Sequence, residues 1–267
     1  MALTAFQRDV LRLIAASRIE SGESYIAGAA ALNTILDAPR LSRDLDLFHD
    51  TEEALQRTWA SDRTLLEAKG LALEVVRERP SFVQAIVRRG REVLSLDWVR
   101  ESAYRFFPLI THPELGLTLH PFDLATNKVL ALVGRVEVRD WIDTIECGEK
   151  IQHLGYLAWA ACGKDPGYSP PAILEAAARS CRYSGAEVAQ LAFAGPTPDA
   201  AELARRWHLQ LDEARELVTK LPPEHAGCAV LDASGSLYRG EALARDLGRG
   251  AVRFHPGAIR GAFPSLR

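Results

Sequence analysis

The sequence contains little lysine, little cysteine and no long uncharged apolar segment. Five of its 32 basic residues are lysine, so arginine is the background cation and each lysine can be questioned individually. No apolar run is long enough to cross a bilayer, and the first 20 residues lack the apolar core and cleavage site of a signal peptide. We therefore expect a cytoplasmic location. The cysteines are far apart and predict buried, reduced thiols (Cys147, Cys162, Cys181 and Cys228).

A large excess of charge of either sign is also missing. The 32 basic and 35 acidic residues leave a net charge of -3, which excludes a strongly basic coat for nucleic acid but not a local basic patch. Histidines with the spacing of a zinc site and the G-x-S-x-G motif of serine hydrolases are absent from the sequence. Apolar residues make up 48% of the 267 residues, enough to build a sizeable core, so wholesale disorder is excluded.

The sequence pattern changes along the chain. Periodicity predicts helices over 4–17, 29–36 and 52–69, and strands over 24–27, 44–48, 71–77, 82–88 and 92–99. From residue 124 the pattern is helical, and 163–171 resembles a linker. Beyond it lie further helices and a possible hairpin of 228–231 with 236–238. We predict an α+β fold: a domain over 1–163, with a mixed sheet to about residue 120 and then helices, and a mostly helical C-terminal domain over 164–267.

An alternating run of carboxylates is the most informative local pattern. Asp44 and Asp46 share one face of a predicted strand, where two neighbouring negative charges favour a bound cation, and Mg²⁺ suits carboxylate and phosphate oxygens. Asp97 lies in another predicted strand, and if the two strands are adjacent the three carboxylates converge and could hold two Mg²⁺ ions. The alternative, that the D-x-D pattern is the solvated side of an exposed strand, stays open on spacing alone.

A glycine precedes this strand at a junction with its own chemistry. Gly28 ends a predicted strand and begins a helix of small residues, so the first backbone N–H groups of that helix could bind an anion. A tight turn with no ligand is the simpler interpretation of Gly28 alone. A strand, a glycine, a helix and then a D-x-D strand form a more specific combination.

That combination resembles the nucleotidyltransferase superfamily with the polymerase-β-like fold. Within it, three segments resemble motifs of the AbiEii/AbiGii toxin family. Residues 25–32 resemble its "hydrophobic-Ala-Gly-Gly-Thr-Ala-Leu" turn, and 40–48 resemble its Arg-x-Ser/Thr-x-Asp-x-Asp segment. Residues 121–143 resemble its helix that carries Lys, then Ala, Arg, Arg-Asp and Asp, here Lys128, Ala131, Arg135, Arg139-Asp140 and Asp143.

The resemblance implies a cytoplasmic bacterial enzyme that uses a nucleoside triphosphate and Mg²⁺. Family members act as toxins of toxin–antitoxin pairs, and some add nucleotides to tRNA. By matching position, Asp44 and Asp46 would be catalytic and bind metal, Lys128 would contact the triphosphate, and Asp143 would lie near the active site. Asp97 would be a third metal ligand by the broader superfamily pattern. The nucleotide-binding residues would be Gly28, Ala29, Ala30, Ser42 and Lys128.

The sequence departs from the family at Ala29 and Ala30. These residues replace a glycine and a Ser/Thr, so a hydroxyl that could bond a phosphate is missing. Two alternatives to transfer onto RNA stay open. A nucleotidyltransferase acting on a small molecule or a protein side chain suits a near-neutral chain as well as one acting on RNA does, and the two alanines favour a catalytically inactive nucleotidyltransferase fold that binds a partner. An arginine-rich tail that includes Arg253 and Arg260 could hold an RNA acceptor.

Overall fold

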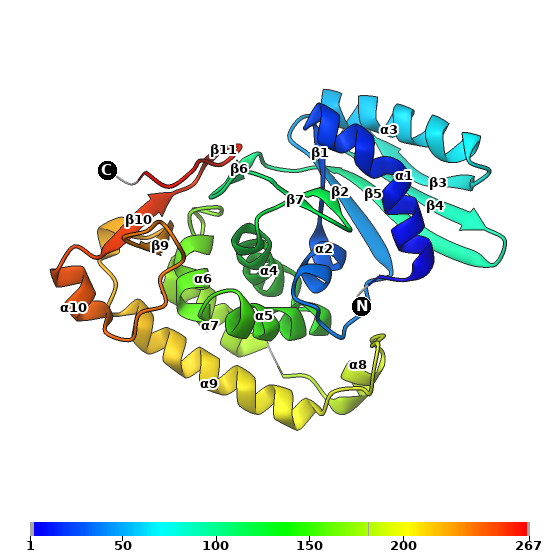
Figure 1. Cartoon of the computed structure of the whole chain (residues 1–267). Helices are drawn as coiled ribbons and strands as arrows, with labels where there is room; N and C mark the ends of the chain where they lie inside the picture. Colours follow the sequence, from blue (N-terminus) through cyan, green and yellow to red (C-terminus); the bar gives the residue numbers. More distant parts are fainter. Residues whose placement is uncertain (1–2, 181, 266–267) are drawn as a thin grey trace. The chain divides into compact units, whose positions relative to one another are not determined.

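The computed structural model describes residues 3–180 and 182–265 (Figure 1). Contacts divide them into two compact units. Unit 1 takes the described residues up to Ala103, together with Leu109–His120 and Ala192–Gly195. Unit 2 takes Tyr104–Pro108, the described residues of 121–191, and those from Pro196 onward.

Unit 1 is built on a mixed sheet with the strand order β3-β4-β5-β2-β1-β8-β7. Strand β2 runs parallel to β5 and β1 runs parallel to β8, whereas the other neighbours are antiparallel. The mixed sheet that the sequence predicted is therefore confirmed. Its strands are β1 (Ser24–Ala27), β2 (Asp44–His49), β3 (Ala72–Arg79), β4 (Phe82–Arg89), β5 (Glu92–Arg100), β7 (Ile110–His112) and β8 (Gly116–Thr118).

Two helices cover one face of this sheet, α1 (Ala5–Ser21) and α3 (Glu52–Ala68) (Figure 1). They meet through a fully buried ion pair between Arg18 and Asp62, whose N–O distance is 2.5 Å. The same Asp62 carboxylate accepts a hydrogen bond from Trp98 Nε1 of β5 at 2.8 Å. In this pair each buried charge faces an opposite charge, which offsets the cost of burying it. The opposite face is the one that carries the aspartates.

Local signals explain where these helices begin and end. Thr4 and Gln7 form a reciprocal capping box at the start of α1, and Thr51 accepts a hydrogen bond from the Ala54 amide at the start of α3. The chain leaves α3 through Gly70, whose φ of +78° suits glycine, as the sequence predicted. Helix α2 (Gly28–Ile35) follows β1 directly.

Unit 2 is mostly helical, as the sequence predicted for the C-terminal part. Helix α6 is buried along its whole length and packs against its neighbours α4, α7 and α9. Two short antiparallel pairs complete the unit, β6 (Tyr104–Arg105) with β11 (Ala258–Ile259), and β9 (Cys228–Asp232) with β10 (Val252–Pro256). The helices are α4 (Pro121–Arg135), α5 (Val138–Lys150), α6 (Leu154–Ala161), α7 (Pro170–Ser180), α8 (Gly185–Ala189), α9 (Ala200–Val218) and α10 (Leu243–Gly248), with a 3-10 turn at Pro223–His225.

The compact units divide the chain at other positions than the predicted boundary at 163/164. Unit 2 takes in α4 to α6 and continues through the predicted linker. Gly163, at the start of the predicted linker, packs closely against another segment. A Cβ on Gly163 would lie 2.2 Å from the carbonyl oxygen of Gly227. The predicted hairpin partner, 236–238, makes one bridge to β9 at Leu231 and Leu237, while the full ladder of β9 is with β10.

The described cysteines are free thiols, as expected. Cys147 and Cys162 are buried and Cys228 is partly buried, whereas Cys181 lies outside the described residues. Burial raises the pKa of Cys162 to about 11, so this thiol is protonated at neutral pH. Among the residues that the structure describes, none of the helices is long and apolar enough to span a membrane.

Candidate active site

The two aspartates of β2 lie on the face of the sheet that α1 and α3 leave open. Along the strand, Asp44 and Asp46 are half-buried, while Leu45 and Leu47 between them are fully buried. This alternation confirms the predicted arrangement, in which the carboxylates share one face and the leucines pack behind them. The strand therefore presents two carboxylates side by side from a rigid backbone.

Gly28 gives the Asp46 carboxylate its place. The residue has a φ of +68°, and a Cβ built on it would lie 1.8 Å from Asp46 Oδ2. Asp46 pairs with Ala27 in the β1–β2 ladder, so its carboxylate lies against the first residue of α2. The first N–H groups of a helix lack partners inside the helix and attract negative charge. Only glycine leaves room for this carboxylate at the start of α2.

Asp97 lies beside Asp46 on the neighbouring strand. Strands β2 and β5 are parallel, with Asp46 opposite Asp97 and Asp44 opposite Ser95, so the adjacency that the sequence left conditional is present. Asp97 Oδ1 accepts hydrogen bonds from Gln84 Nε2 at 3.1 Å and from Ser95 Oγ at 3.3 Å. Gln84 is not among the site residues predicted from the sequence. The two-residue hairpin turn at Gly90 places it opposite Asp97, which is the signal that could have found it.

The environment of Asp97 disfavours its negative charge. Burial raises the pKa of Asp97, and the nearby charge of Asp44 raises it further, whereas the hydrogen bonds from Gln84 and Ser95 partly offset the rise. A cation bound among these carboxylates would relieve this cost. The electrostatics of the open face are therefore those of a site that favours a positively charged ligand.

The chemistry of this donor set suits Mg²⁺. Carboxylate oxygens are hard ligands, and this ion is usually held by one or two protein carboxylates together with phosphate oxygens and water. Gly28 leaves the space that keeps Asp46 in place for such a role. Within residues 3–180 and 182–265, no group of three or more His, Cys, Asp or Glu side chains is gathered closely enough to hold a metal, so Asp97 is adjacent to the Asp44–Asp46 pair without forming a three-ligand cluster.

The other predicted nucleotide-binding residues of unit 1 differ in exposure. Ala29 is half-exposed at the start of α2, whereas Ala30 is fully buried and its methyl group packs in the core. Ser42 is buried, and its hydroxyl donates to Asp44 Oδ1 at 3.4 Å. Backbone groups at the start of α2 and the half-exposed Ala29 are therefore what this junction offers to a phosphate.

The predicted site residues of unit 2 form a buried ion cluster. Lys128 on α4 is 6% exposed, and its Nζ lies 2.8 Å from Asp140 Oδ1 and 3.1 Å from Asp143 Oδ2, both on α5. Arg135 pairs with Asp140 at 3.0 Å. Lys128 and Arg135 therefore contact the same carboxylate from one side of α4. Lys128 and Asp143 are thus brought together, with Asp140 as their shared neighbour.

The sequence predicts two further local features here, Gly134 as the break between two helices and Asp123 as the N-cap of a helix that starts at Leu124, and both predictions are wrong. Gly134 does not separate the helices, because α4 continues to Arg135 and the chain turns at Val136, which has a φ of +56°. Asp123 does not cap a helix at Leu124, because α4 already begins at Pro121. Its buried carboxylate instead accepts hydrogen bonds from the amides of Phe106 and Phe107 at 2.8 and 3.0 Å and pairs with Lys164 at 2.8 Å. Lys164, which lies in the predicted linker, is therefore a second lysine whose side chain is largely enclosed, at 8% exposure.

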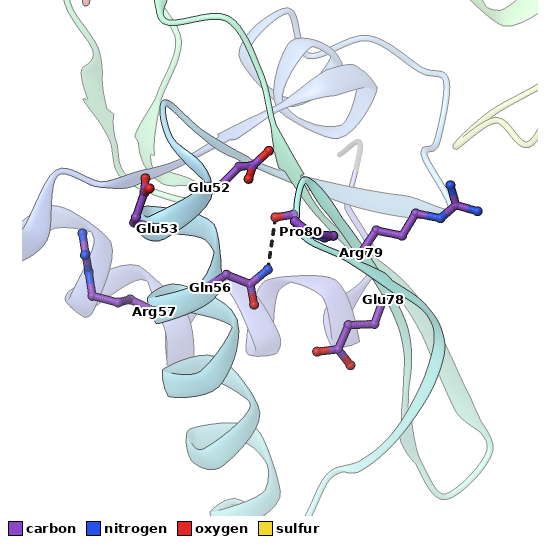
Figure 2. Close-up of a pocket in the computed structure, with 7 residues that line it drawn as sticks. All are labelled: Glu52, Glu53, Gln56, Arg57, Glu78, Arg79 and Pro80. Carbon is purple, nitrogen blue, oxygen red and sulfur yellow. Dashed lines mark hydrogen bonds between the residues drawn. The ribbon is translucent and has the colours of Figure 1, made fainter.

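An open pocket of about 710 Å³ lies elsewhere in unit 1. Figure 2 shows it between the first turns of α3 and the turn from β3 to β4, where Gln56 Nε2 donates to the carbonyl oxygen of Pro80 at 3.1 Å. Its remaining lining residues are charged (Glu52, Glu53, Arg57, Glu78 and Arg79). None of the site residues predicted from the sequence lines this pocket.

Comparison with models of known protein families finds no match, and comparison with curated protein sequences finds none either. Solved structures with a similar fold include a candidate nucleotidyltransferase from H. pylori, with a TM-score of 0.52, 16% identity, and coverage of 83% of this chain and 99% of that one. JHP933 from Helicobacter pylori has a TM-score of 0.50 and 15% identity over 79% of this chain and 91% of its own.

A third similar structure is MenT4, a nucleotidyltransferase toxin from Mycobacterium tuberculosis. It has a TM-score of 0.51 and 17% identity over 81% of this chain and 83% of its own. At these identities the likeness establishes the fold. The chain therefore has the fold of nucleotidyltransferases, and the resemblance drawn from the three sequence motifs is confirmed at that level.

Proposed function

We propose that this chain is an Mg²⁺-dependent nucleotidyltransferase of the bacterial cytoplasm, which transfers a nucleotide from a nucleoside triphosphate to an acceptor and releases pyrophosphate. One observation carries the proposal: the Asp46 carboxylate lies against Gly28 at the start of α2, in a position that any side chain at residue 28 would occupy. The fold shared with nucleotidyltransferases supports the same interpretation.

In this proposal the residues of the open sheet face hold the metal and the nucleotide. Asp44 and Asp46 would bind Mg²⁺, with two ions as the full complement, and Asp97 beside Asp46 on β5 would add a third negative charge next to this pair. Bound Mg²⁺ supplies charge neutralisation at the triphosphate and lowers the pKa of the acceptor hydroxyl. The backbone of Gly28, Ala29 and Ala30 receives phosphate oxygens, and Ser42 orients Asp44 through its hydroxyl.

For unit 2, the proposal assigns Lys128 to the triphosphate and Asp143 to the support of Lys128. A lysine is a compact cation suited to phosphate oxygens, and charge on the leaving pyrophosphate needs such a group. The two carboxylates within 3.1 Å of Nζ hold the ammonium in one place. Asp140 has a structural part, because it also pairs with Arg135.

The acceptor in this proposal is RNA such as tRNA, or a protein side chain. One of the similar structures is the toxin MenT4, so a toxin role with a cognate antitoxin as partner is the first role to test. Arg253 and Arg260 are the residues proposed to hold an RNA acceptor. Replacing both with Glu would then abolish transfer to RNA. If the double variant kept full transfer to RNA, these two arginines would not hold the RNA acceptor.

The test is transfer of labelled nucleotide from each of the four nucleoside triphosphates to separate pools of RNA, protein and small molecules. Asp46→Asn is expected to abolish transfer and pyrophosphate release without loss of the fold, because it removes a metal ligand on a half-exposed face. Asp212→Asn is the matched control, since Asp212 is an exposed carboxylate that pairs with Arg215 on α9. Release of pyrophosphate by Asp46→Asn at the wild-type rate would contradict the proposal. The pool that becomes labelled identifies the acceptor as RNA, a protein or a small molecule.

A second function has one specific observation in its favour. Ala29 is half-exposed at the start of α2 and offers a methyl group where a phosphate-binding turn offers a hydroxyl or no side chain. This favours a catalytically inactive nucleotidyltransferase fold that binds a partner. Calorimetry with each nucleotide and Mg²⁺ separates the two, because the inactive form predicts no heat of nucleotide binding.

A further inference from the structure

The segment that leads into Asp44 is extended and is held by helices on one side. Asn33 Nδ2 of α2 donates to the carbonyl oxygen of Arg40 at 3.1 Å. Gln7 Nε2 of α1 donates to the carbonyl oxygen of Ser42 at 2.8 Å. Alternate residues of this segment are thus fastened by buried side chains. The backbone groups of Pro39 and Leu41, which alternate with them, are bonded elsewhere.

A distant segment supplies those bonds. We call Ala192–Gly195 the strap. Its Ala194 amide donates to the carbonyl oxygen of Pro39 at 2.7 Å, and the Leu41 amide donates to the carbonyl oxygen of Ala192 at 2.9 Å. Together these bonds make an antiparallel bridge between Arg40 and Phe193. The strap belongs to unit 1, although the described residues before and after it belong to unit 2.

The strap acts on the residues that place the first carboxylate. Leu41 is followed by Ser42, whose hydroxyl contacts Asp44 Oδ1 at 3.4 Å, and then by Asp44, the first residue of β2. Asp46 lies deeper in β2 and has a second support in the space left by Gly28. Asp44 is the first residue of β2, so its position depends on the end of that strand and on the extended segment that precedes it. Loosening the segment should therefore displace Asp44 more than Asp46.

We propose that the strap is a positioning segment for Asp44. By bonding Pro39 and Leu41 it fixes the extended segment on the side that α1 and α2 do not reach, and so keeps the Asp44 carboxylate where a cation can bind it. The proposal rests on the proposed function in taking Asp44 as a metal ligand. It also means that residues beyond 163 contribute to the metal site, so the first 163 residues alone would lack part of its support.

The variant that tests the strap is Ala194→Pro. Proline has no N–H, so this change removes the bond to Pro39 at an exposed position without touching the core. Ala194→Gly is a milder second variant that keeps the N–H and loosens the backbone. Gly195→Ala is the matched control: a Cβ there meets nothing within 4 Å, and the strap keeps both of its bonds.

Two readouts are needed for the whole chain. Hydrogen exchange at the amides of Leu41 and Asp44 reports whether the strap holds the segment. Titration with Mn²⁺, followed by electron paramagnetic resonance, reports the carboxylate site with an ion that binds the same ligands as Mg²⁺. Circular dichroism confirms that each variant is folded.

For Ala194→Pro we expect faster exchange at both amides and Mn²⁺ binding weaker by about two- to tenfold, the range that corresponds to one backbone hydrogen bond. Ala194→Gly should fall between it and the wild type, and Gly195→Ala should match the wild type. Unchanged exchange at Leu41 and Asp44, or faster exchange with unchanged Mn²⁺ affinity, would overturn the proposal. If the wild type binds no Mn²⁺, the proposed metal site fails, while faster exchange at Asp44 in Ala194→Pro still supports the positioning role and unchanged exchange overturns it.

Discussion

The two aspartate-bearing regions of this chain solve the problem of negative charge in different ways. On the open sheet face of unit 1, Asp97 lies between Gln84 and Ser95, which are neutral donors, and burial raises its pKa. In unit 2, the fully buried Asp140 lies against Lys128 and Arg135, so its charge is compensated inside the protein. The first region favours a cation from outside, while the second already contains its cations. The same residue type is therefore suited to ligand binding in one region and to structural support in the other.

Breaking the ion cluster is expected to have the largest effect on stability. Lys128→Met would leave Asp140 and Asp143 buried with their shared cation removed, and loss of one partner of a buried pair costs about 3–5 kcal/mol of unfolding free energy. Urea denaturation measures this change. The control is Lys220→Met, which breaks an exposed pair with Glu216 and should change the unfolding free energy by less than about 1 kcal/mol. Equal losses in the two variants would contradict the comparison.

The covered face of β2 provides a pH-dependent contrast with its open face. Burial lowers the pKa of His49 to about 4, from an ordinary value of 6.5, and its Nδ1 lies 3.3 Å from the carbonyl oxygen of Val99. Because the folded-state pKa is lowered, the stabilisation is complete above pH 6.5 and is lost as the pH falls toward 4. Between pH 7.5 and 5 we expect a loss of about 2 kcal/mol.

Urea denaturation at both pH values measures the His49 effect. The variant His49→Leu isolates it from the titration of carboxyl groups, because leucine cannot take up the proton. The variant should lose less unfolding free energy than the wild type over the same pH interval. An identical loss in the two proteins would show that His49 does not bind a proton on unfolding in this range.

The smallest expected change in stability belongs to two glycine variants, which test whether the open face binds a cation. Gly28→Ala and Gly22→Ala both place a side chain at positive φ, which costs about 1–2 kcal/mol in each case. At Gly22 the added Cβ meets nothing within 4 Å, whereas at Gly28 it would displace the carboxylate of Asp46. Thermal denaturation should therefore show a loss in both variants, at least as large in Gly28→Ala as in Gly22→Ala, while calorimetric titration shows Mg²⁺ binding abolished only in Gly28→Ala. If Gly28→Ala still bound Mg²⁺, the contact between Gly28 and Asp46 would no longer support the proposed function.

Much of unit 1 could be predicted because its signals are local. Alternation along 44–48 predicted which side chains of β2 share a face, and the strands predicted over 82–88 and 92–99 match β4 and β5. Period-two alternation is a property of the strand itself and does not depend on what surrounds it. In unit 2 the spacing of a helix likewise puts Lys128 and Arg135 on one side of α4, and both contact Asp140.

Other features depend on pairs of residues that are distant in the sequence. The boundary expected at residue 163 followed a local composition typical of linkers, but Gly163 is needed for a close approach to Gly227. Lys164 lies in the predicted linker, yet its side chain is 8% exposed and its Nζ lies 2.8 Å from Asp123 Oδ1. The strap has no sequence signature, because backbone hydrogen bonds carry no side-chain identity.

By itself, the sequence determined the strands, their faces, the turn at Gly28 and the motifs that suggested a nucleotidyltransferase fold, because these follow from periodicity and from the conformational freedom of glycine. The tertiary structure alone decided that Asp46 rests against Gly28, that Gln84 and Ser95 hold Asp97, and that the strap fastens the segment before Asp44. These contacts join residues whose spacing in sequence says nothing of their distance in space, since only packing of the whole chain brings them together.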